Sequence, residues 1–414
     1  MKEQADGMDE QRAMVNGAWS SIQREWALDL NMKKEQRIQA FMDEFREYCV
    51  LLRQEQLAGR KGNIRYITYS MLRTAWLEEH PVYWVEAADD LWVLDPKPVQ
   101  SVYDASWVYG YWTELRGHLL TEAQAQQVAL SELVLEQMML GAAVHIHAML
   151  VSLIRLALKR AVVLPEFQQL DREETFEIRV GEYMDWSVCV YKEEHRLLDS
   201  SLVRDWLEEE QEHAYSYQAL TGVQLPGGDY SHFDFRYTAF RQIGMEGSRL
   251  HACILVGTVW QESQLDETNF TYSLINGADF SGCSMQGAVL EGVMGNAGFG
   301  EEDWDGEPLG YAGVNFTGTN LQNASFKGAQ LQGAVFEAAV LHKASFVGTN
   351  LTDACFVGAD LAGASFAGAM VTSADFTGAK LQGVSFTDEQ RSDSRGIPFD
   401  EGSGCHENLS INSG

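Results

Sequence analysis

Large apolar residues recur at every fifth position over the C-terminal third of the chain. The register runs without a gap from Phe316 to Phe386, and the residue two positions before each member is Ala, Thr or Val. An α-helix repeats its apolar face every 3.6 residues and a β-strand every 2, so neither gives a period of five. We interpret the pattern as a coil with four short sides and about twenty residues per turn, each side directing one large and one small residue inward.

Residues twenty positions apart then lie on the same side of successive coils, one strand spacing (about 4.8 Å) apart. This arrangement predicts two ladders of stacked rings inside the coil. One ladder consists of Phe316, Phe336, Phe356 and Phe376, and the other of Phe326, Phe346, Phe366 and Phe386.

A looser block with the same period precedes the long one, from Phe235 to Leu290. Its small partners are more polar and include Thr238, Ser248 and Cys253. The register breaks at about residues 291–313, which contain "GFGEEDWDGEPLGY". We therefore expect the repeats to be interrupted by an acidic loop.

The stretches "GTNLTDACFVGADLAGASFAGAM" and "ADFTGAKLQGVSF" resemble the pentapeptide-repeat proteins, whose pattern is roughly A(D/N)LXX. The resemblance covers about residues 235–387 and implies a right-handed quadrilateral β-helix. It is specific for the fold and uninformative about function, since one fold serves many functions.

Residues 1–229 differ in kind from the repeats. Residues 9–56 and 121–163 have helical spacing, and the alternation in "VYWVEAADDLWVLD" and "TFEIRVGEYMDWSVCVY" predicts two hairpins, turning at Asp89–Asp90 and at Gly181–Asp185. The expected fold is thus an α+β two-domain chain. It has a mainly helical N-terminal domain (1–229), a β-helix (230–387), and a flexible tail or end cap (388–414).

The charge excludes some classes of partner. The chain carries 60 Asp and Glu against 30 Lys and Arg, a formal net charge of -30. Phosphate backbones and anionic membranes bind basic surfaces, so we expect neither direct nucleic-acid binding nor membrane association. No secretory signal is evident, and the most apolar stretch, 138–158, is interrupted by two His and an Arg. We expect a cytoplasmic, bacterial protein.

No motif indicates chemistry. The six Cys are dispersed without a CxxC pair, which favours free thiols over zinc or disulfides. Glu210 and His213 form one ExxH motif, whereas di-iron carboxylate sites need two. His145 and His147 lie about 200° apart around a helix and cannot share a metal. We predict no catalytic, metal or cofactor site and no enzymatic activity; an enzyme or ligand-binding activity in the N-terminal domain is an alternative.

The acidic loop is the candidate partner-binding site. An aromatic ring among carboxylates on a protruding loop suits docking to a basic protein groove. A solvated excursion from the coil is the simpler interpretation. The candidate residues are Glu301, Glu302, Asp303, Trp304, Asp305 and Glu307.

Some members of the family protect type II topoisomerases from inhibitors by imitating duplex DNA, and the resemblance implies this as an alternative function. Residues 316–386, however, carry only four acidic residues against three Lys. A DNA mimic of about four coils needs roughly ten carboxylates, at one per 1.7 Å. The long block is therefore a poor mimic.

Outward positions of the long block are instead small, neutral or apolar. They include a serine column (Ser325, Ser345, Ser365 and Ser385) and Val335, Val340, Val347, Cys355, Val357 and Met370. We predict a protein-interaction scaffold whose partner the sequence does not identify. Because an uncovered last coil would expose unpaired strand groups, we also predict either a homodimer through the C-terminal coil or capping by the tail, with Ile397 and Phe399 folded back.

Overall fold

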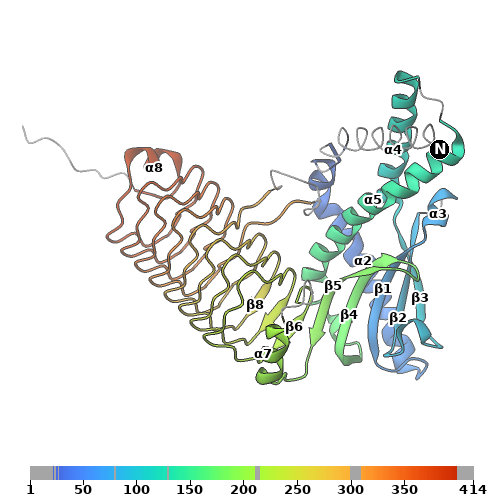
Figure 1. Ribbon diagram of the computed structural model, residues 1–414, viewed down its shortest axis with the longest axis horizontal. Coiled ribbons are helices and arrows are strands. Elements are labelled where there is room, and N and C mark those ends of the chain that lie inside the picture. Colours follow the sequence, from blue (N-terminus) through green and yellow to red (C-terminus); the bar gives the residue numbers. More distant parts are fainter. Residues whose placement is uncertain are drawn as a thin grey trace, which may run out of the picture. The chain divides into compact units, whose positions relative to one another are not determined.

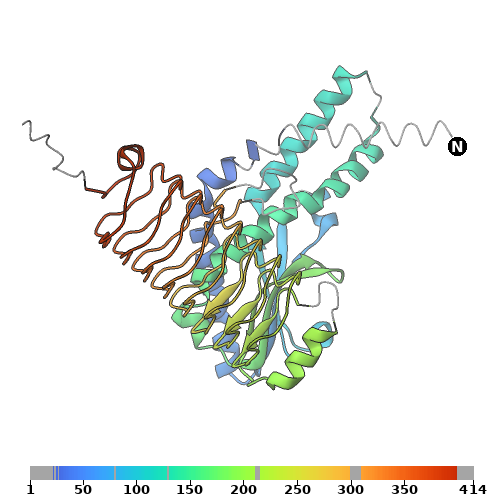
Figure 2. The ribbon, with the colours of Figure 1, turned by 60° about the vertical axis from the view of Figure 1, so that its left-hand side comes forward.

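The computed structural model describes residues 22, 25–26, 28–78, 81–127, 130–209, 215–298 and 309–398 (Figures 1 and 2). The chain divides into two compact units. The N-terminal unit consists of Met1–Leu197, Tyr217–Thr221 and Phe299–Tyr311. The repeat unit consists of Leu198–Ser216, Gly222–Gly298 and Ala312–Gly414.

A five-stranded sheet forms the centre of the N-terminal unit. Its order is β3-β2-β1-β4-β5, with β1 and β4 parallel and the other neighbours antiparallel. Alternation along β1 buries Ile67, Tyr69 and Met71 on one face. The strands are β1 (Ile64–Met71), β2 (Val82–Ala88), β3 (Val99–Asp104), β4 (Arg172–Glu182) and β5 (Ser187–Glu194).

Helices pack against the buried face of this sheet. Along α2, apolar residues at helical spacing face inward, and the ring of Phe41 lies 5.7 Å from Tyr69 and 5.8 Å from Tyr103. The helices of this unit are α2 (Lys34–Leu57), α3 (Arg73–Leu77), the 3-10 helix η1 (Trp92–Leu94), α4 (Ser106–Ala125), α5 (Glu132–Ala161) and α6 (Pro165–Gln168).

The longest of these helices is α5, which starts at an N-cap where Ser131 accepts a hydrogen bond from the Val134 amide. In the part of the chain that the structure describes, it is the one helix long and apolar enough to cross a membrane, and 61% of its most apolar window is buried inside the protein. Its apolar residues belong to the core of the N-terminal unit.

The exposed edge of β3 is shielded by α2. Tyr48 Oη donates a hydrogen bond to the Val99 carbonyl (2.7 Å), and the Asp104 amide donates to Glu44 Oε2 (3.4 Å). Covering an edge strand with a helix prevents it from pairing with other chains.

The prediction of a hairpin confined to residues 82–95 is wrong. Only Val82–Ala88 forms a strand there; Trp92–Leu94 is a 3-10 turn, and β2 pairs instead with β3. The central strand β1 was not predicted. The second predicted hairpin corresponds to β4 and β5, which pair antiparallel around Gly181–Ser187.

Backbone pairing between residues twenty apart defines the repeat unit as a β-helix. Parallel bridges join Asn315 to Val335 and Val335 to Cys355, and three further columns pass through Asn320, Ser325 and Gln330. The longest pairings earlier in the coil are β7 (Ala239–Arg241) with β8 (Val259–Gln261). The remaining elements are β6 (Ala219–Thr221), which belongs to the N-terminal unit, and α7 (Ser200–Glu208) and α8 (Asp388–Asp393), which belong to the repeat unit.

The interruption leaves the stack in register. Bridged residues are 20 apart before it and 36 apart across it, as in Asp279 to Asn315, so the insertion is sixteen residues (36 minus 20).

Gly295 occupies an inward position on the coil before the insertion. A Cβ there would lie 2.9 Å from Ile275 Cγ1 and from Val314 Cγ1, so neighbouring side chains fill the space of the missing one.

The two predicted ring ladders are confirmed. The ring of Phe336 lies 5.1 Å from Phe316 and 4.8 Å from Phe356, nearly parallel to both. In the second ladder, Phe346 lies 4.9 Å from both of its neighbours. Rings of the two ladders meet edge to face, with Phe336 and Phe346 5.6 Å apart.

The first block adds buried polar bonds between coils. At its small inward positions, Thr268 Oγ1 donates to the Met245 carbonyl (2.8 Å) and Ser248 Oγ to the Leu225 carbonyl (2.8 Å), each acceptor lying 23 residues earlier. In the long block most of these positions are Ala, and Thr349 is an exception (2.7 Å to the Phe326 carbonyl).

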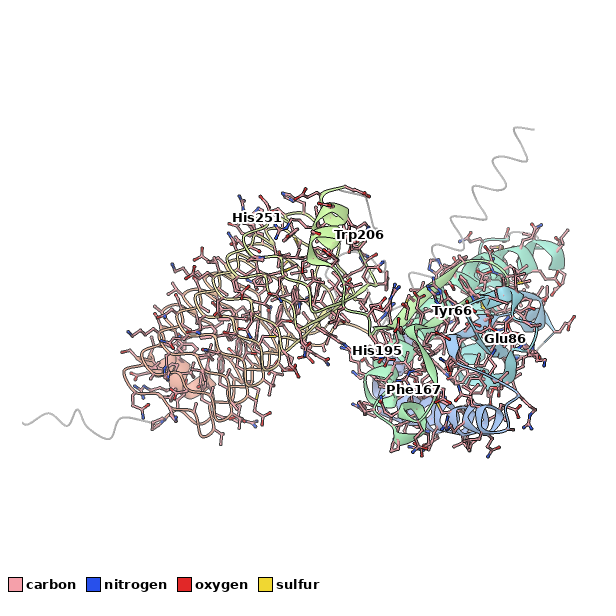
Figure 3. All side chains as sticks on the ribbon, turned by 90° about the horizontal axis from the view of Figure 1, so that it is seen from below. Tyr66, Glu86, Phe167, His195, Trp206 and His251 are labelled. Carbon is pink, nitrogen blue, oxygen red and sulfur yellow. The ribbon has the colours of Figure 1, made fainter. Side chains whose placement is uncertain are left out.

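Both described ends of the coil are covered. At the first coil, Trp206 of α7 (labelled in Figure 3) packs 4.8 Å from Tyr215, and Tyr215 stacks on Phe233 at 4.9 Å. At the last, a capping box formed by Thr387 and Gln390 starts α8. Gln390 Nε2 donates to the carbonyls of Phe366 and Ala369, both at 2.9 Å.

The chain after α8 adds one more pairing to the coil, between Arg395 and Asp375, and Ile397 is buried. The described part of the tail therefore caps the last coil, which was one of the two predicted alternatives. Phe399 lies outside the described residues.

Candidate interaction surface

The predicted partner-binding residues Glu301, Glu302, Asp303, Trp304, Asp305 and Glu307 lie outside the described residues. After them, Leu309 is 3% exposed and belongs to the core of the N-terminal unit. No sequence pattern predicts this burial, because Leu309 is a single apolar residue outside the five-residue register.

The outward side chains of the long block are short and mostly uncharged, and they form the side walls of the coil. Val335 pairs with Cys355 in one column, and Val357 lies two residues further along the same side. Val347 and Met370 are exposed at 38% and 56%. We call Val335, Cys355 and Val357 the wall patch.

The predicted serine column is present on another side of the coil. Bridges join Ser325 to Ser345 and Ser345 to Ser365. Ser325 Oγ donates a hydrogen bond to Glu291 Oε1 at 2.7 Å. This side presents hydroxyl groups rather than apolar carbon, so it differs in chemistry from the wall patch.

One of the four carboxylates of the long block, Asp360, is held in ion pairs and is not free to imitate a phosphate. Asp360 contacts Lys380 Nζ at 2.9 Å and His342 Nε2 at 2.7 Å. The hydrogen bond from Lys380, with help from His342, lowers the pKa of Asp360 to about 2. Glu337 and Asp353 make no ion pair with any residue that the structure describes.

His145 and His147 lie on opposite faces of α5, as their spacing predicted: His145 is exposed and His147 is fully buried. His147 Nδ1 is 2.8 Å from Tyr83 Oη, and its ring stacks on that of Tyr83. Burial, with the nearby charge of Arg73, lowers the pKa of His147 to about 4. The imidazole is therefore neutral at pH 7 and serves as a core residue.

No cluster of three or more His, Cys, Asp or Glu side chains suited to a metal occurs among the described residues. Glu210 and His213 lie outside them. The described Cys residues are free, and burial raises the pKa of Cys49, Cys189, Cys253 and Cys283 to about 12.

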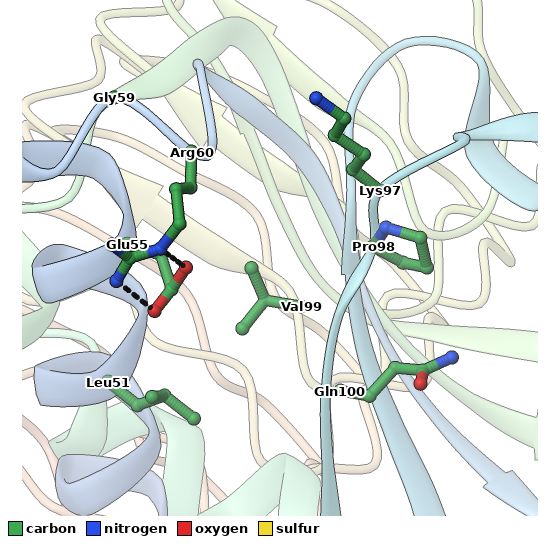
Figure 4. Close-up of a pocket in the computed structure, with 8 residues that line it drawn as sticks. All are labelled: Leu51, Glu55, Gly59, Arg60, Lys97, Pro98, Val99 and Gln100. Carbon is green, nitrogen blue, oxygen red and sulfur yellow. Dashed lines mark hydrogen bonds and ion pairs between the residues drawn. The ribbon is translucent and has the colours of Figure 1, made fainter.

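An open pocket of about 550 Å³ lies between α2 and the start of β3 (Figure 4). Sequence reasoning missed it because it joins segments forty residues apart, and neither segment carries a motif. We call it the slot. It is lined by Leu51, Glu55, Gly59, Arg60, Lys97, Pro98, Val99 and Gln100.

Comparison with known families identifies the repeats. The family described as "Pentapeptide repeats" matches residues 245–282, 319–357 and 356–388, in 8 copies. Residues 245–388 therefore carry pentapeptide repeats, and no family was recognised in the N-terminal part.

Several solved structures are similar to part of the chain. Trypsin-treated QnrB1, a plasmid-mediated fluoroquinolone resistance protein, is 20% identical, with a TM-score of 0.30, covering 44% of this chain and 90% of QnrB1. HetL of Nostoc sp. strain PCC 7120, a pentapeptide repeat protein involved in heterocyst differentiation regulation, is 18% identical, with a TM-score of 0.20 and coverages of 46% and 92%. A comparison with curated proteins gave no match.

Proposed function

We propose that this protein is a non-enzymatic scaffold that binds a protein partner through the side walls of its β-helix. The observation that carries the proposal is the wall chemistry of residues 316–386. Its outward side chains are short, mostly neutral and partly apolar. They stand on a backbone in which each coil pairs with the coils before and after it. Rigid walls of this kind bind without losing much conformational entropy.

The covered ends support side-wall binding. An open coil end would present unpaired strand groups to another chain. Here α8 and Arg395 occupy that position at the last coil. A homodimer through the C-terminal coil would therefore require the cap to move.

A DNA mimic that binds a type II topoisomerase is the alternative, and the charges favour it less. The long block has four carboxylates, and one of these, Asp360, is paired with Lys380 and His342. If mimicry operates, the acidic run from Glu301 to Glu307 has to supply it. The protein would then rescue supercoiling by gyrase in the presence of a quinolone, and Gln and Asn substitutions along the run would abolish the rescue.

The scaffold proposal includes a right-handed, four-sided coil and a cytoplasmic, bacterial setting. The five-residue period supports the four-sided coil. Handedness is accessible to an experimental structure, and localisation to fractionation of the source cells.

The test compares two substitutions in the full chain. Val357→Asp places a charge in the wall patch, and Ala367→Asp places the same charge ten residues along the same coil, on another side. We expect a protein captured by the unmodified chain and by Ala367→Asp to be lost with Val357→Asp. Equal capture by all three chains would contradict binding at the wall patch.

A further inference from the structure

Four consecutive apolar side chains are exposed on the turn between β2 and β3. Leu91, Trp92, Val93 and Leu94 are 53%, 37%, 61% and 77% exposed. Runs of exposed apolar residues are avoided in soluble proteins unless they contact something. We call Leu91–Leu94 the knuckle.

A buried ion pair fixes the base of the knuckle. Asp95 accepts hydrogen bonds from the amides of Asp89 (2.9 Å) and Lys97 (2.8 Å) and pairs with Lys61 Nζ. The side chains of Asp95 and Lys61 are 2% and 4% exposed. The turn is therefore held in one conformation although its tip faces solvent.

Trp92 anchors the knuckle to the sheet. Its ring stacks on Tyr66 at 4.9 Å, and the guanidinium of Arg179 lies 5.5 Å from the ring centre. Trp92 has a φ of 53°, a left-handed conformation that is unfavourable for a bulky residue. Such strain persists where the surroundings enforce it, often at functional sites. With Trp92 held, Leu91, Val93 and Leu94 remain free to contact another molecule.

The slot has the complementary chemistry and lies next along the chain. Leu51, Pro98 and Val99 give it apolar lining, and Figure 4 shows Arg60 and Lys97 on opposite sides of Val99. Arg60 is paired with Glu55 at 2.6 and 2.7 Å. Lys97 Nζ has no ion pair with any of the described residues, so it can donate hydrogen bonds to a carboxylate of another molecule.

We propose that the knuckle of one copy of this chain inserts into the slot of a second copy, and reciprocally, in a two-fold dimer. The apolar tip matches the apolar lining, and the exposed Asp90 beside the knuckle matches Lys97. Only two residues, Asp95 and Pro96, separate the knuckle from Lys97 of the slot, so the two surfaces are close enough to belong to one self-complementary interface. The proposal does not depend on the scaffold function, but a dimer would present two β-helices and so bind repeated partners with higher avidity.

The experiment is sedimentation equilibrium on the full chain, with the dimer dissociation constant as readout. We expect Leu94→Asp to raise it by roughly 100-fold, because symmetry applies the change twice. Leu94 is exposed, so the subunit should keep its fold. Val163→Asp, at another apolar residue of the N-terminal unit that is 70% exposed, is the matched control and should leave it unchanged.

A charge exchange tests the identity of the partner. Asp90→Lys and Lys97→Glu should each weaken the dimer by roughly tenfold, and an equimolar mixture of the two variants should restore it, since each knuckle then meets a slot of opposite charge. A chain that stays monomeric to roughly 100 μM would overturn the proposal. A dimer whose dissociation constant is unchanged by Leu94→Asp would also overturn it, as would a mixture of the two charge variants that does not restore association.

Discussion

The repeat unit and the N-terminal unit are stabilised in different ways. Inside the β-helix the same contact recurs, with rings 4.8 to 5.1 Å apart in one ladder. The N-terminal unit depends on single contacts between distant segments, including the Lys61–Asp95 pair and the His147–Tyr83 hydrogen bond. One substitution in the β-helix therefore removes several copies of the same contact, whereas one in the N-terminal unit removes a contact that occurs once. The comparison predicts that the two units respond differently to mutation and to pH.

The largest effect is expected from Phe336→Ala in the ring ladder. The substitution removes a ring in contact with Phe316, Phe326, Phe346 and Phe356 and leaves a cavity that two coils cannot close. We expect the free energy of unfolding of the repeat unit to fall by about 3–5 kcal/mol. Urea unfolding followed by circular dichroism measures it.

Phe336→Leu is the matched control, because it keeps most of the volume and should cost less than about 1.5 kcal/mol. If both variants unfold at the urea concentration of the unmodified chain, the ladder does not stabilise the coil.

In the N-terminal unit, Lys61→Met should cost nearly as much. It leaves Asp95 buried without its counter-ion, and removing one partner of a buried pair costs about 3–5 kcal/mol. Thermal unfolding of the N-terminal unit provides the measurement. Lys34→Met, at a partly exposed lysine at the start of α2 outside the slot, should change stability by no more than about 0.5 kcal/mol. Equal effects of the two substitutions would show that the buried pair is dispensable.

Acid should destabilise the N-terminal unit before the repeat unit. The pKa of His147 is about 4 in the folded chain and ordinarily 6.5, so the unfolded chain binds the proton more readily. The stability from neutral, buried His147 is present above pH 6.5 and is lost as the pH falls towards 4, by roughly 3 kcal/mol in total. Unfolding measured at several pH values should show this slope.

His147→Gln should flatten the slope between pH 6.5 and 4, and substitution of the exposed His145 by Gln should leave it unchanged. The same slope in all three chains would mean that other groups cause it.

A smaller effect separates the two blocks of the β-helix. Thr268→Val removes the hydroxyl that bonds to the Met245 carbonyl, which keeps its bond from the Ser248 amide (3.1 Å). The expected loss is about 1 kcal/mol in urea unfolding, since no buried acceptor is left unpaired. Thr372→Val, at an exposed position of the long block, should change nothing measurable. A loss at Thr372 equal to that at Thr268 would contradict a role for the buried hydroxyls.

The contrast also explains what the sequence could predict. The position of Phe336 in its ladder can be predicted by counting residues in steps of twenty, because each coil contacts only the coils before and after it. The slot does not follow from any local pattern, because Leu51 and Val99 meet only through the packing of α2 against the sheet. The apolar run at Leu91–Leu94 suggested a strand, since pattern alone does not reveal that Asp95 turns inward to pair with Lys61. The strand β1 was not predicted. In the sheet it lies between β2, the next strand in the chain, and β4, which comes only after α4, α5 and α6. Its central position therefore depends on pairing between distant segments.

The most direct test of the scaffold proposal is photo-cross-linking from the wall itself. A photo-reactive phenylalanine analogue would replace Val357 in the full chain, and Ala367 in a matched chain, in the cells that produce the protein. We predict a discrete protein adduct from position 357 that is absent from position 367. No adduct from 357, or the same adducts from both positions, would contradict binding through the wall patch.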